Sequence, residues 1–286
     1  MRGPTTTGRY RGGMTTTSRE RLVRLVRRAD ADLAEAALLC CAEVDPDLDV
    51  DLALLRLDAL ADGLRTRGFQ AEDPEQAARR IAEYLAVEQG FTGDTDTYHH
   101  PDNALLTRVL DRKRGLPITC SILYVAIARR LDVRAYLVNL PGHVVAAVPG
   151  PDRPILIDPF HDGQVLDERA VAQRITELSA GQATFHRAML RPTHAVDVVR
   201  RLLNNLTRDF QATGDAMKAL WSVELKLLLP NRTPEDHRIL GELLEQVGRF
   251  DEAAVAFEDY LEATDGEAHD DTEIRHAAIR AKARLN

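Results

Sequence analysis

The chain has 286 residues, a hydrophobic content of 44%, a charged content of 29% and a formal net charge of -8 at pH 7. This length suits two domains with cores of their own, and the composition is that of a globular protein. The negative charge argues against a nucleic-acid partner, because phosphate binding needs a clustered basic face. No apolar run approaches the roughly 18 residues of a membrane helix, so no membrane partner is expected.

The first 16 residues, MRGPTTTGRYRGGMTT, contain no apolar stretch and therefore do not form a secretory signal. We expect a disordered leader over 1–16, with Met14 as an alternative start. Cys40 and Cys41 lie in a long apolar stretch and are expected in the core. Together with Cys120 they are too few for a disulfide framework, and no CxxC or HxxxH spacing predicts a metal site. The sequence thus predicts a cytoplasmic protein without cofactor or metal.

From residue 17 to 90 the apolar residues recur at helical spacing, which predicts an all-α region. The segment PDLDVDLALLRLDALADGLRTRG begins with acids and proline and is expected to stop at Gly68. The next segment, DPEQAARRIAEYLAVEQG, has Asp73 as the expected N-cap, Pro74 as the first helical residue and Gly90 as the stop.

The middle third, residues 91–192, changes from helical to alternating periodicity. A turn-rich loop, FTGDTDTYHHPDN, precedes a short predicted helix that ends at Gly115 and a second helix from Pro117 to about Leu131. The β-branched runs VRAYLVN, HVVAAV and PILID then predict an antiparallel meander, and the Asp-Gly pair at 162–163 predicts a hairpin turn. A helix followed by such a meander indicates an α+β core.

Residues 193–286 are helical again and contain an internal repeat. TGDAMKALWSVELKLLLP and VGRFDEAAVAFEDYLEAT align at a spacing of 34 residues, the period of tetratricopeptide helix hairpins. Chance similarity of two amphipathic helices is the alternative. Because two units are fewer than such arrays need alone, we expect the tail to pack on the rest of the chain. The coincident pairs are Gly214/Gly248, Ala219/Ala253, Val223/Phe257, Leu227/Leu261, Leu206/Leu240 and Phe210/Leu244.

Three residues of the middle third have the types that a thiol enzyme needs. Cys120 lies in the first turn of its predicted helix, where the helix N-terminus stabilises a thiolate. His143 begins a strand and can act as base, and Asp158 ends the next strand and can orient the imidazole. Neighbouring strands of a meander would place His143 beside Asp158.

Each of these residues also has a plain structural interpretation. Cys120 is followed by SILYVAIA and can fill core, and an aspartate at a strand end often accepts backbone N–H groups. Thr119 is the other candidate nucleophile, although it is better suited to capping the helix. His99 and His100 lie in a loop that can be solvated or cover a site, and His161 is equally ambiguous.

The segments PDLDVDLALLRLDALADGLRTR, YHHPDNALLTRVLDRKRGLPITCSILYVAIARRLDVRAYLVNLPGHVVAAV and ILIDPFHDGQVL, with the tail, resemble the SirB family of transglutaminase-like proteins. The resemblance implies a papain- or transglutaminase-like core between an all-α N-terminal region and a tetratricopeptide-like tail. It also implies a catalytic order of Cys, His and Asp, which His143 and Asp158 match. Cys120 departs from the pattern, because the superfamily cysteine falls near Pro117 and SirB proteins have leucine after "PIT".

Two functions follow as expectations. The first is a thiol hydrolase or acyltransferase that acts on an amide or ester with Cys120, His143 and Asp158. The second is a non-catalytic relative that binds a protein or peptide through its groove and helical tail. In the first case Cys120 alkylates rapidly with a titration below pH 8, whereas in the second all three cysteines are slow.

Overall fold

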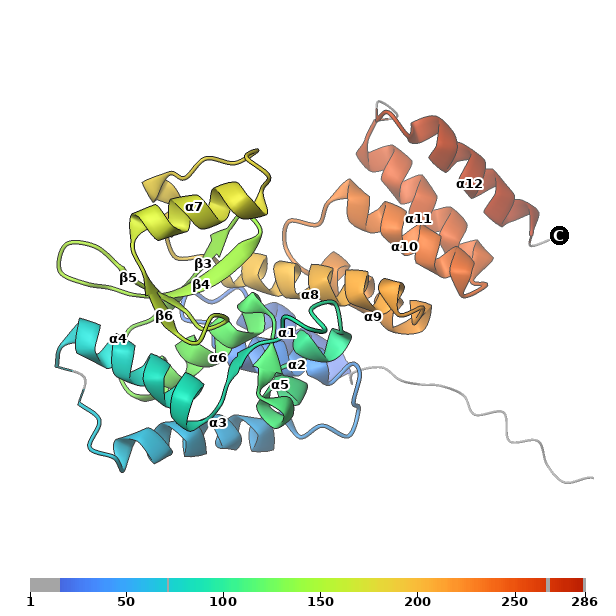
Figure 1. Cartoon of the computed structure of the whole chain (residues 1–286). Coiled ribbons are helices and arrows are strands. Elements are labelled where there is room, and N and C mark those ends of the chain that lie inside the picture. The colour runs from blue at the N-terminus through green and yellow to red at the C-terminus, as the bar shows by residue number, and fades with distance from the viewer. Residues whose placement is uncertain (1–15, 71, 266–267, 285–286) are drawn as a thin grey trace, which may run out of the picture.

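The computed structural model describes residues 16–70, 72–265 and 268–284, so the predicted leader lies, apart from Thr16, outside the described residues. The chain begins with helices that cover one side of the core (Figure 1). Asp73 caps α4 by accepting the backbone N–H groups of Glu75 and Gln76, as predicted. The N-terminal elements are α1 (Thr16–Leu25), α2 (Leu33–Cys41), α3 (Val50–Arg65), α4 (Pro74–Glu83) and the π-helical turn η1 (Tyr84–Glu88).

The next segment corrects one predicted boundary. The short helix α5 (Leu106–Arg112) ends before Gly115, because Lys113 already takes a left-handed conformation with φ of 62°. Gly115 instead allows a close approach, since a Cβ there would lie 2.7 Å from the Thr119 hydroxyl. The other elements of this segment are β1 (Thr92–Gly93), η2 (Pro101–Asn103), β2 (Arg114–Gly115) and α6 (Pro117–Arg130).

A four-stranded antiparallel meander follows α6, as the alternating pattern predicts. The strands occur in the spatial order of the chain, and β5 and β6 are joined by the predicted Asp-Gly turn. Asp162 and Gly163 both have positive φ, 53° and 73°, which is typical of a tight hairpin turn. The strands are β3 (Tyr136–Leu140), β4 (His143–Val148), β5 (Ile155–Asp158) and β6 (Gln164–Leu166).

The two faces of this sheet pack on different helices (Figure 1). Val144, Ala146 and Ile157 join the main core, which contains the buried residues of α6. On the opposite face, Val145, Ala147 and Leu156 belong to a second core with Val171 and Ile175 of α7 (Glu168–Leu178). Helix α7, which supplies a residue of the candidate site, was not predicted from the sequence.

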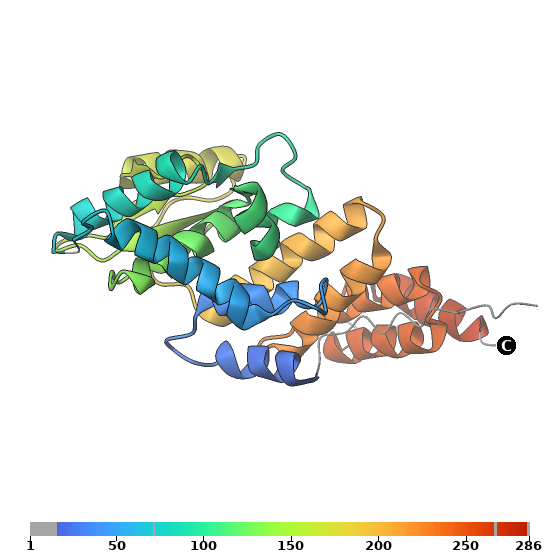
Figure 2. The same ribbon diagram turned by 90° about the horizontal axis from the view of Figure 1, so that it is seen from below.

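The C-terminal helices repeat with the predicted period. The pair α8 (Ala195–Ala212) and α9 (Ala216–Leu228) is followed by α10 (Pro234–Gln246) and α11 (Phe250–Ala263), and α12 (Asp271–Ala283) packs on α11. Gly214 and Gly248 occupy equivalent turns with φ of 76° and 78°, and Ala219 and Ala253 are both fully buried. The tail contacts the rest of the chain through α8, which packs against α2 and α6 (Figure 2). Its tetratricopeptide identity stays a prediction.

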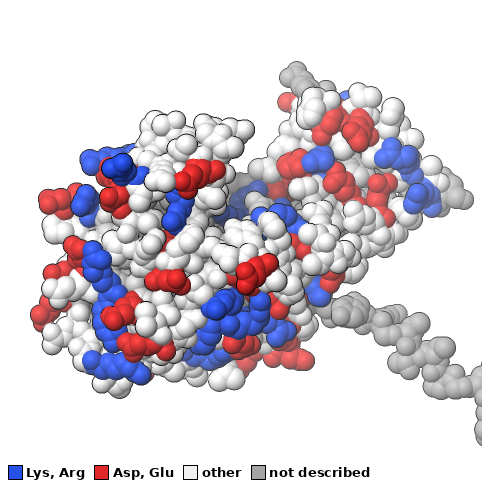
Figure 3. All heavy atoms as spheres, viewed as in Figure 1, with Lys and Arg blue, Asp and Glu red and all other residues white. Residues whose placement is uncertain are grey.

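Acidic and basic side chains are mixed over the face shown in Figure 3. The absence of a nucleic-acid partner, which rests on the net charge, stays a prediction. Over the described residues, the structure contains no helix of the length and apolarity that a membrane crossing requires.

Candidate functional site

The predicted neighbours His143 and Asp158 meet at the end of the meander. The His143 Nε2 atom lies 2.8 Å from Asp158 Oδ2, and both side chains are buried. The other carboxylate oxygen, Oδ1, accepts the backbone N–H groups of Phe160 and His161 at 3.2 and 3.3 Å. These contacts hold the carboxylate in one orientation.

Asp158 contacts two more side chains than the sequence predicts, those of His161 and Arg174. The Nδ1 atom of His161 lies 2.9 Å from Asp158 Oδ2, and the Arg174 guanidinium of α7 pairs with the same oxygen. Burial raises the pKa of Asp158, but the hydrogen bonds and charges of His143 and His161 outweigh burial and hold the pKa well below its usual range. Asp158 is therefore a buried, ionised carboxylate surrounded by nitrogen groups.

Cys120 does not join this cluster through a hydrogen bond. Its thiol donates to the backbone oxygen of Thr92 at 3.6 Å, and within the described part of the chain it has no hydrogen bond to His143. The side chain is buried, with 4% of the residue exposed. Burial, with a smaller contribution from the negative charge of Asp158, raises the pKa of the Cys120 thiol to about 12. The thiol is therefore protonated at neutral pH.

Strand geometry places His143 and helix α6 on opposite faces of the sheet. His143 is paired with Leu140, a residue of the core beneath α7, and side chains of directly paired residues share a face. Asp158 lies two residues beyond Leu156 and so points to that face too. Cys120 belongs to α6, which packs on the opposite face of the sheet.

Phe160 lies between the loop beside Cys120 and the histidine. Its backbone oxygen accepts the N–H of Gly93 at 2.9 Å, and its ring centroid is 6.1 Å from that of His143. The ring packs so closely on Gly93 that a Cβ there would lie 2.5 Å from a ring carbon. Phe160 therefore contacts both His143 and the Thr92–Gly93 segment, whose Thr92 oxygen accepts from Cys120.

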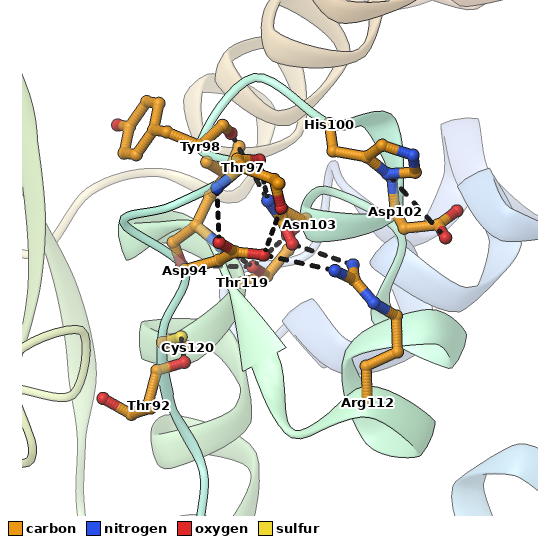
Figure 4. A network of polar contacts seen from close by, with 11 residues as sticks. Thr92, Asp94, Thr97, Tyr98, His100, Asp102, Asn103, Arg112, Thr119 and Cys120 are labelled. Carbon is orange, nitrogen blue, oxygen red and sulfur yellow. Dashed lines mark hydrogen bonds and ion pairs between the residues drawn. The ribbon is translucent and has the colours of Figure 1, made fainter.

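A polar network fixes the loop that precedes α6 (Figure 4). The Asn103 amide nitrogen donates to the Thr97 backbone oxygen at 2.7 Å, and its amide oxygen accepts from Arg112 at 2.9 Å. Arg112 also pairs with Asp94 at 3.1 Å. Thr119 donates to the Asn103 backbone oxygen at 2.7 Å and accepts from the Leu116 N–H at 2.9 Å. Thr119 thus caps α6, as predicted, and is not positioned as a nucleophile.

The remaining sequence candidates divide into two groups. His161 belongs to the Asp158 cluster, with 44% of its side chain exposed. His99 and His100 are exposed in the loop, and His99 Nδ1 lies 3.4 Å from Asp209 Oδ1 of α8. Arg174 was missed by the sequence analysis, because no motif connects a mid-helix arginine with a strand-end aspartate.

Replacing Asn103 by alanine is expected to lower the free energy of unfolding by about 2 kcal/mol, because the Thr97 carbonyl and the Arg112 guanidinium each lose a buried partner. Urea denaturation measures this loss, and limited proteolysis should show faster cleavage in the loop over 92–103. Asp96→Asn, an exposed change in the same loop, serves as the control and should have no measurable effect. Equal stability of the two variants would contradict the anchoring role of Asn103.

Comparison with known proteins places the chain in a family. The sequence profile of the transglutaminase-like superfamily matches residues 52–204. A UPF0162 protein of Pseudomonas aeruginosa is 31% identical over 217 residues, which is 75% of this chain and 78% of the relative. A UPF0162 protein of Xylella fastidiosa is 28% identical over 233 residues, 80% of this chain and 83% of the relative. The chain therefore belongs to the transglutaminase-like superfamily and is related to UPF0162 proteins.

Solved structures resemble this chain only weakly. A tetratricopeptide-repeat protein of Thermus thermophilus covers 93% of this chain and 99% of its own, with 17% identity and a TM-score of 0.26. This score is too low to support an argument about the tail. The SirB assignment and the detailed papain-like core stay predictions.

Proposed function

We propose that this member of the transglutaminase-like superfamily is a non-catalytic relative that binds a peptide or protein partner. The observation that carries the proposal is the state of Cys120. The thiol is buried and donates a hydrogen bond to the Thr92 carbonyl. It belongs to α6, a helix that packs on the face of the sheet opposite to that of His143. With a pKa of about 12, only about one thiol in 10⁵ is ionised at pH 7. Thiol catalysis needs the thiolate next to its base.

A groove of about 920 Å³ is the proposed binding surface. It lies between the N-terminal ends of α4 and α7 and is floored by β5 and β6 residues such as Leu156 and Val165. Because β6 is an edge strand of the four-stranded sheet, an extended peptide can pair along its outer side. The charged lining residues are the acids Glu72, Asp73, Glu75, Asp152, Asp167 and Glu168 and the bases Arg79 and Arg153.

The lining favours a basic, extended segment of a partner. Arg79 and Glu75 pair with each other at 2.8 Å, and the other five lining acids outnumber the one remaining base, so the lining is negative. The apolar floor can take alternate side chains of the segment, while the acidic rim attracts Lys or Arg. The helical tail can extend the contact with a larger partner.

The test uses two labelled peptides that alternate valine with either arginine or glutamate. The arginine peptide is expected to bind saturably with one site per chain, and the glutamate peptide is not. Neutralising the rim with Glu72→Gln and Asp152→Asn should weaken binding about tenfold, which is about 1.4 kcal/mol. Glu20→Gln, an exposed change on α1, should leave binding unchanged. Equal binding of both peptides, or no effect of the rim variant, would refute the groove.

The second candidate, a thiol hydrolase or acyltransferase, is favoured by the His143–Asp158 contact at 2.8 Å. Iodoacetamide distinguishes the two. We expect native Cys120 to alkylate at least about 100-fold more slowly at pH 7.5 than the same residue in urea, because burial suppresses its thiolate. The buried Cys40 and Cys41 provide internal references and should be equally slow. Rapid alkylation of Cys120 alone, with a midpoint below pH 8, would instead establish the thiol enzyme.

A further inference from the structure

The Asp158 cluster has the composition of a metal site. His143 Nε2, Asp158 Oδ2 and His161 Nδ1 all lie within 4.8 Å of one another. Two imidazole nitrogens and one carboxylate oxygen are the ligands that catalytic zinc sites use, with a fourth position left to water. We propose that His143, Asp158 and His161 bind a divalent transition-metal ion of the zinc class, which takes the place of the Arg174 guanidinium.

The distances require only small side-chain rotations. Ligand atoms about 2.1 Å from a tetrahedral zinc ion are about 3.4 Å from one another. Asp158 Oδ2 lies 2.8 Å from His143 Nε2 and 2.9 Å from His161 Nδ1. A metal ion between the three groups therefore separates atoms that now lie in direct contact. His161 supplies the adjustable ligand, because its half-exposed ring can turn while the other two are enclosed.

The surroundings hold the carboxylate and leave a path for the ion. Asp158 Oδ1 is fixed by the N–H groups of Phe160 and His161, which leaves Oδ2 for the metal. Such outer contacts orient ligands in metal sites and contribute to affinity. On the solvent side, the partly exposed His161 gives the ion access.

A positive group already occupies the position. Arg174 pairs with Asp158 Oδ2, and its Nη1 atom lies 2.8 Å from His161 Nδ1. Its side chain comes from the neighbouring helix α7 and is 21% exposed, so it can turn into solvent without a change of backbone. Among the described residues, Asp158 is the one carboxylate in ion-pair contact with Arg174. Arg174 therefore competes with the metal and sets the affinity of the site.

The three proposed ligands lie outside the lining of the peptide groove, and the Cys120 thiol is not one of them. The groove touches β5 at Ile155 and Leu156, whereas the metal ligand Asp158 ends that strand. When a metal ion binds His143 Nε2, it takes the place of the direct hydrogen bond between this atom and Asp158 Oδ2. Loss of peptide binding and loss of metal binding can thus be observed separately.

The test uses the full chain, stripped with a chelator and titrated with Zn²⁺ against a chromophoric competitor. One Zn²⁺ per chain is expected, and Co²⁺ should give the visible absorption of a site with nitrogen and oxygen ligands. His161→Ala should weaken Zn²⁺ binding at least about tenfold, since a first ligand is lost. Arg174→Gln should strengthen it, because the competing charge is gone. His99→Ala removes another exposed histidine and should change nothing.

Circular dichroism of every variant confirms the fold, and His161 is exposed enough for its replacement to be tolerated. The proposal is overturned if the wild type binds no Zn²⁺. This holds even if the Arg174→Gln variant binds Zn²⁺. It is also overturned if His161→Ala binds as tightly as the wild type. Retention of Zn²⁺ by Cys120→Ala is expected, because the thiol is not a ligand.

Discussion

Replacing Asp158 by asparagine is expected to lower the free energy of unfolding by about 3 kcal/mol, because several buried hydrogen bonds lose their charged acceptor. The carboxylate is fully buried and faces His143, His161 and Arg174. Asparagine keeps the shape but loses the charge, so the N–H groups of Phe160 and His161 and the His143 ring lose a charged acceptor. Urea denaturation in metal-free buffer at pH 7 measures the loss.

Two further variants sharpen this result. Arg174→Met should cost less than Asp158→Asn, because the guanidinium is partly exposed and the carboxylate keeps His143 and two backbone N–H groups as partners. Asp152→Asn, on the exposed loop before β5, should change stability by no more than about 0.5 kcal/mol. If Asp158→Asn is as stable as Asp152→Asn, the cluster is solvated and does not stabilise the fold.

The pairing of His143 with Asp158 could be predicted because it depends on topology. Short turns between β-branched runs predict an antiparallel meander, and a meander places the start of one strand beside the end of the next. The Asp-Gly turn fixes β6 in the same way, because both residues adopt positive φ. The repeat in the tail could also be predicted, because its glycines and alanines recur at one spacing.

The position of Cys120 could not be predicted, because the sequence does not show which face of β4 carries His143. All six residues of HVVAAV are buried, so the strand has no polar side to mark its orientation. His143 proved to face α7, whereas α6 with Cys120 covers the other side. In a strand that is buried on both faces, the sequence does not show which face carries the histidine, and a catalytic triad depends on that face.

The role of Arg174 and the proposed metal site could not be predicted from the sequence for a different reason. Metal motifs are found in sequences when ligands share a helix or a loop at short spacing. Here Asp158 and His161 are only three residues apart, but two strands and a loop separate His143 from Asp158, and Arg174 comes from α7. Only the folded sheet brings these groups together.

A buried ion cluster in the tail gives the second large effect. Asp236 of α10 pairs with Lys226 of α9 at 3.2 Å and with Arg200 of α8 at 2.8 Å, and it accepts the Thr233 N–H at 3.0 Å. Asp236→Asn should lower the free energy of unfolding by about 3 to 5 kcal/mol, because two cations lose their shared anion. Lys226→Met should cost less, about 1 to 2 kcal/mol, because Arg200 still neutralises Asp236 and the main loss is the hydrogen bond to Asn204.

The same cluster predicts a dependence on pH. Burial raises the pKa of Asp236, but the Thr233 N–H, Arg200 and Lys226 outweigh burial and lower the pKa overall. A carboxyl with a lowered folded pKa stabilises the protein above its unfolded pKa of about 4, and this contribution is lost as the pH falls through the folded value. Denaturation midpoints between pH 7 and pH 3 should therefore fall more steeply for the wild type than for Asp236→Asn. Parallel curves would show that Asp236 does not link the three helices through its charge.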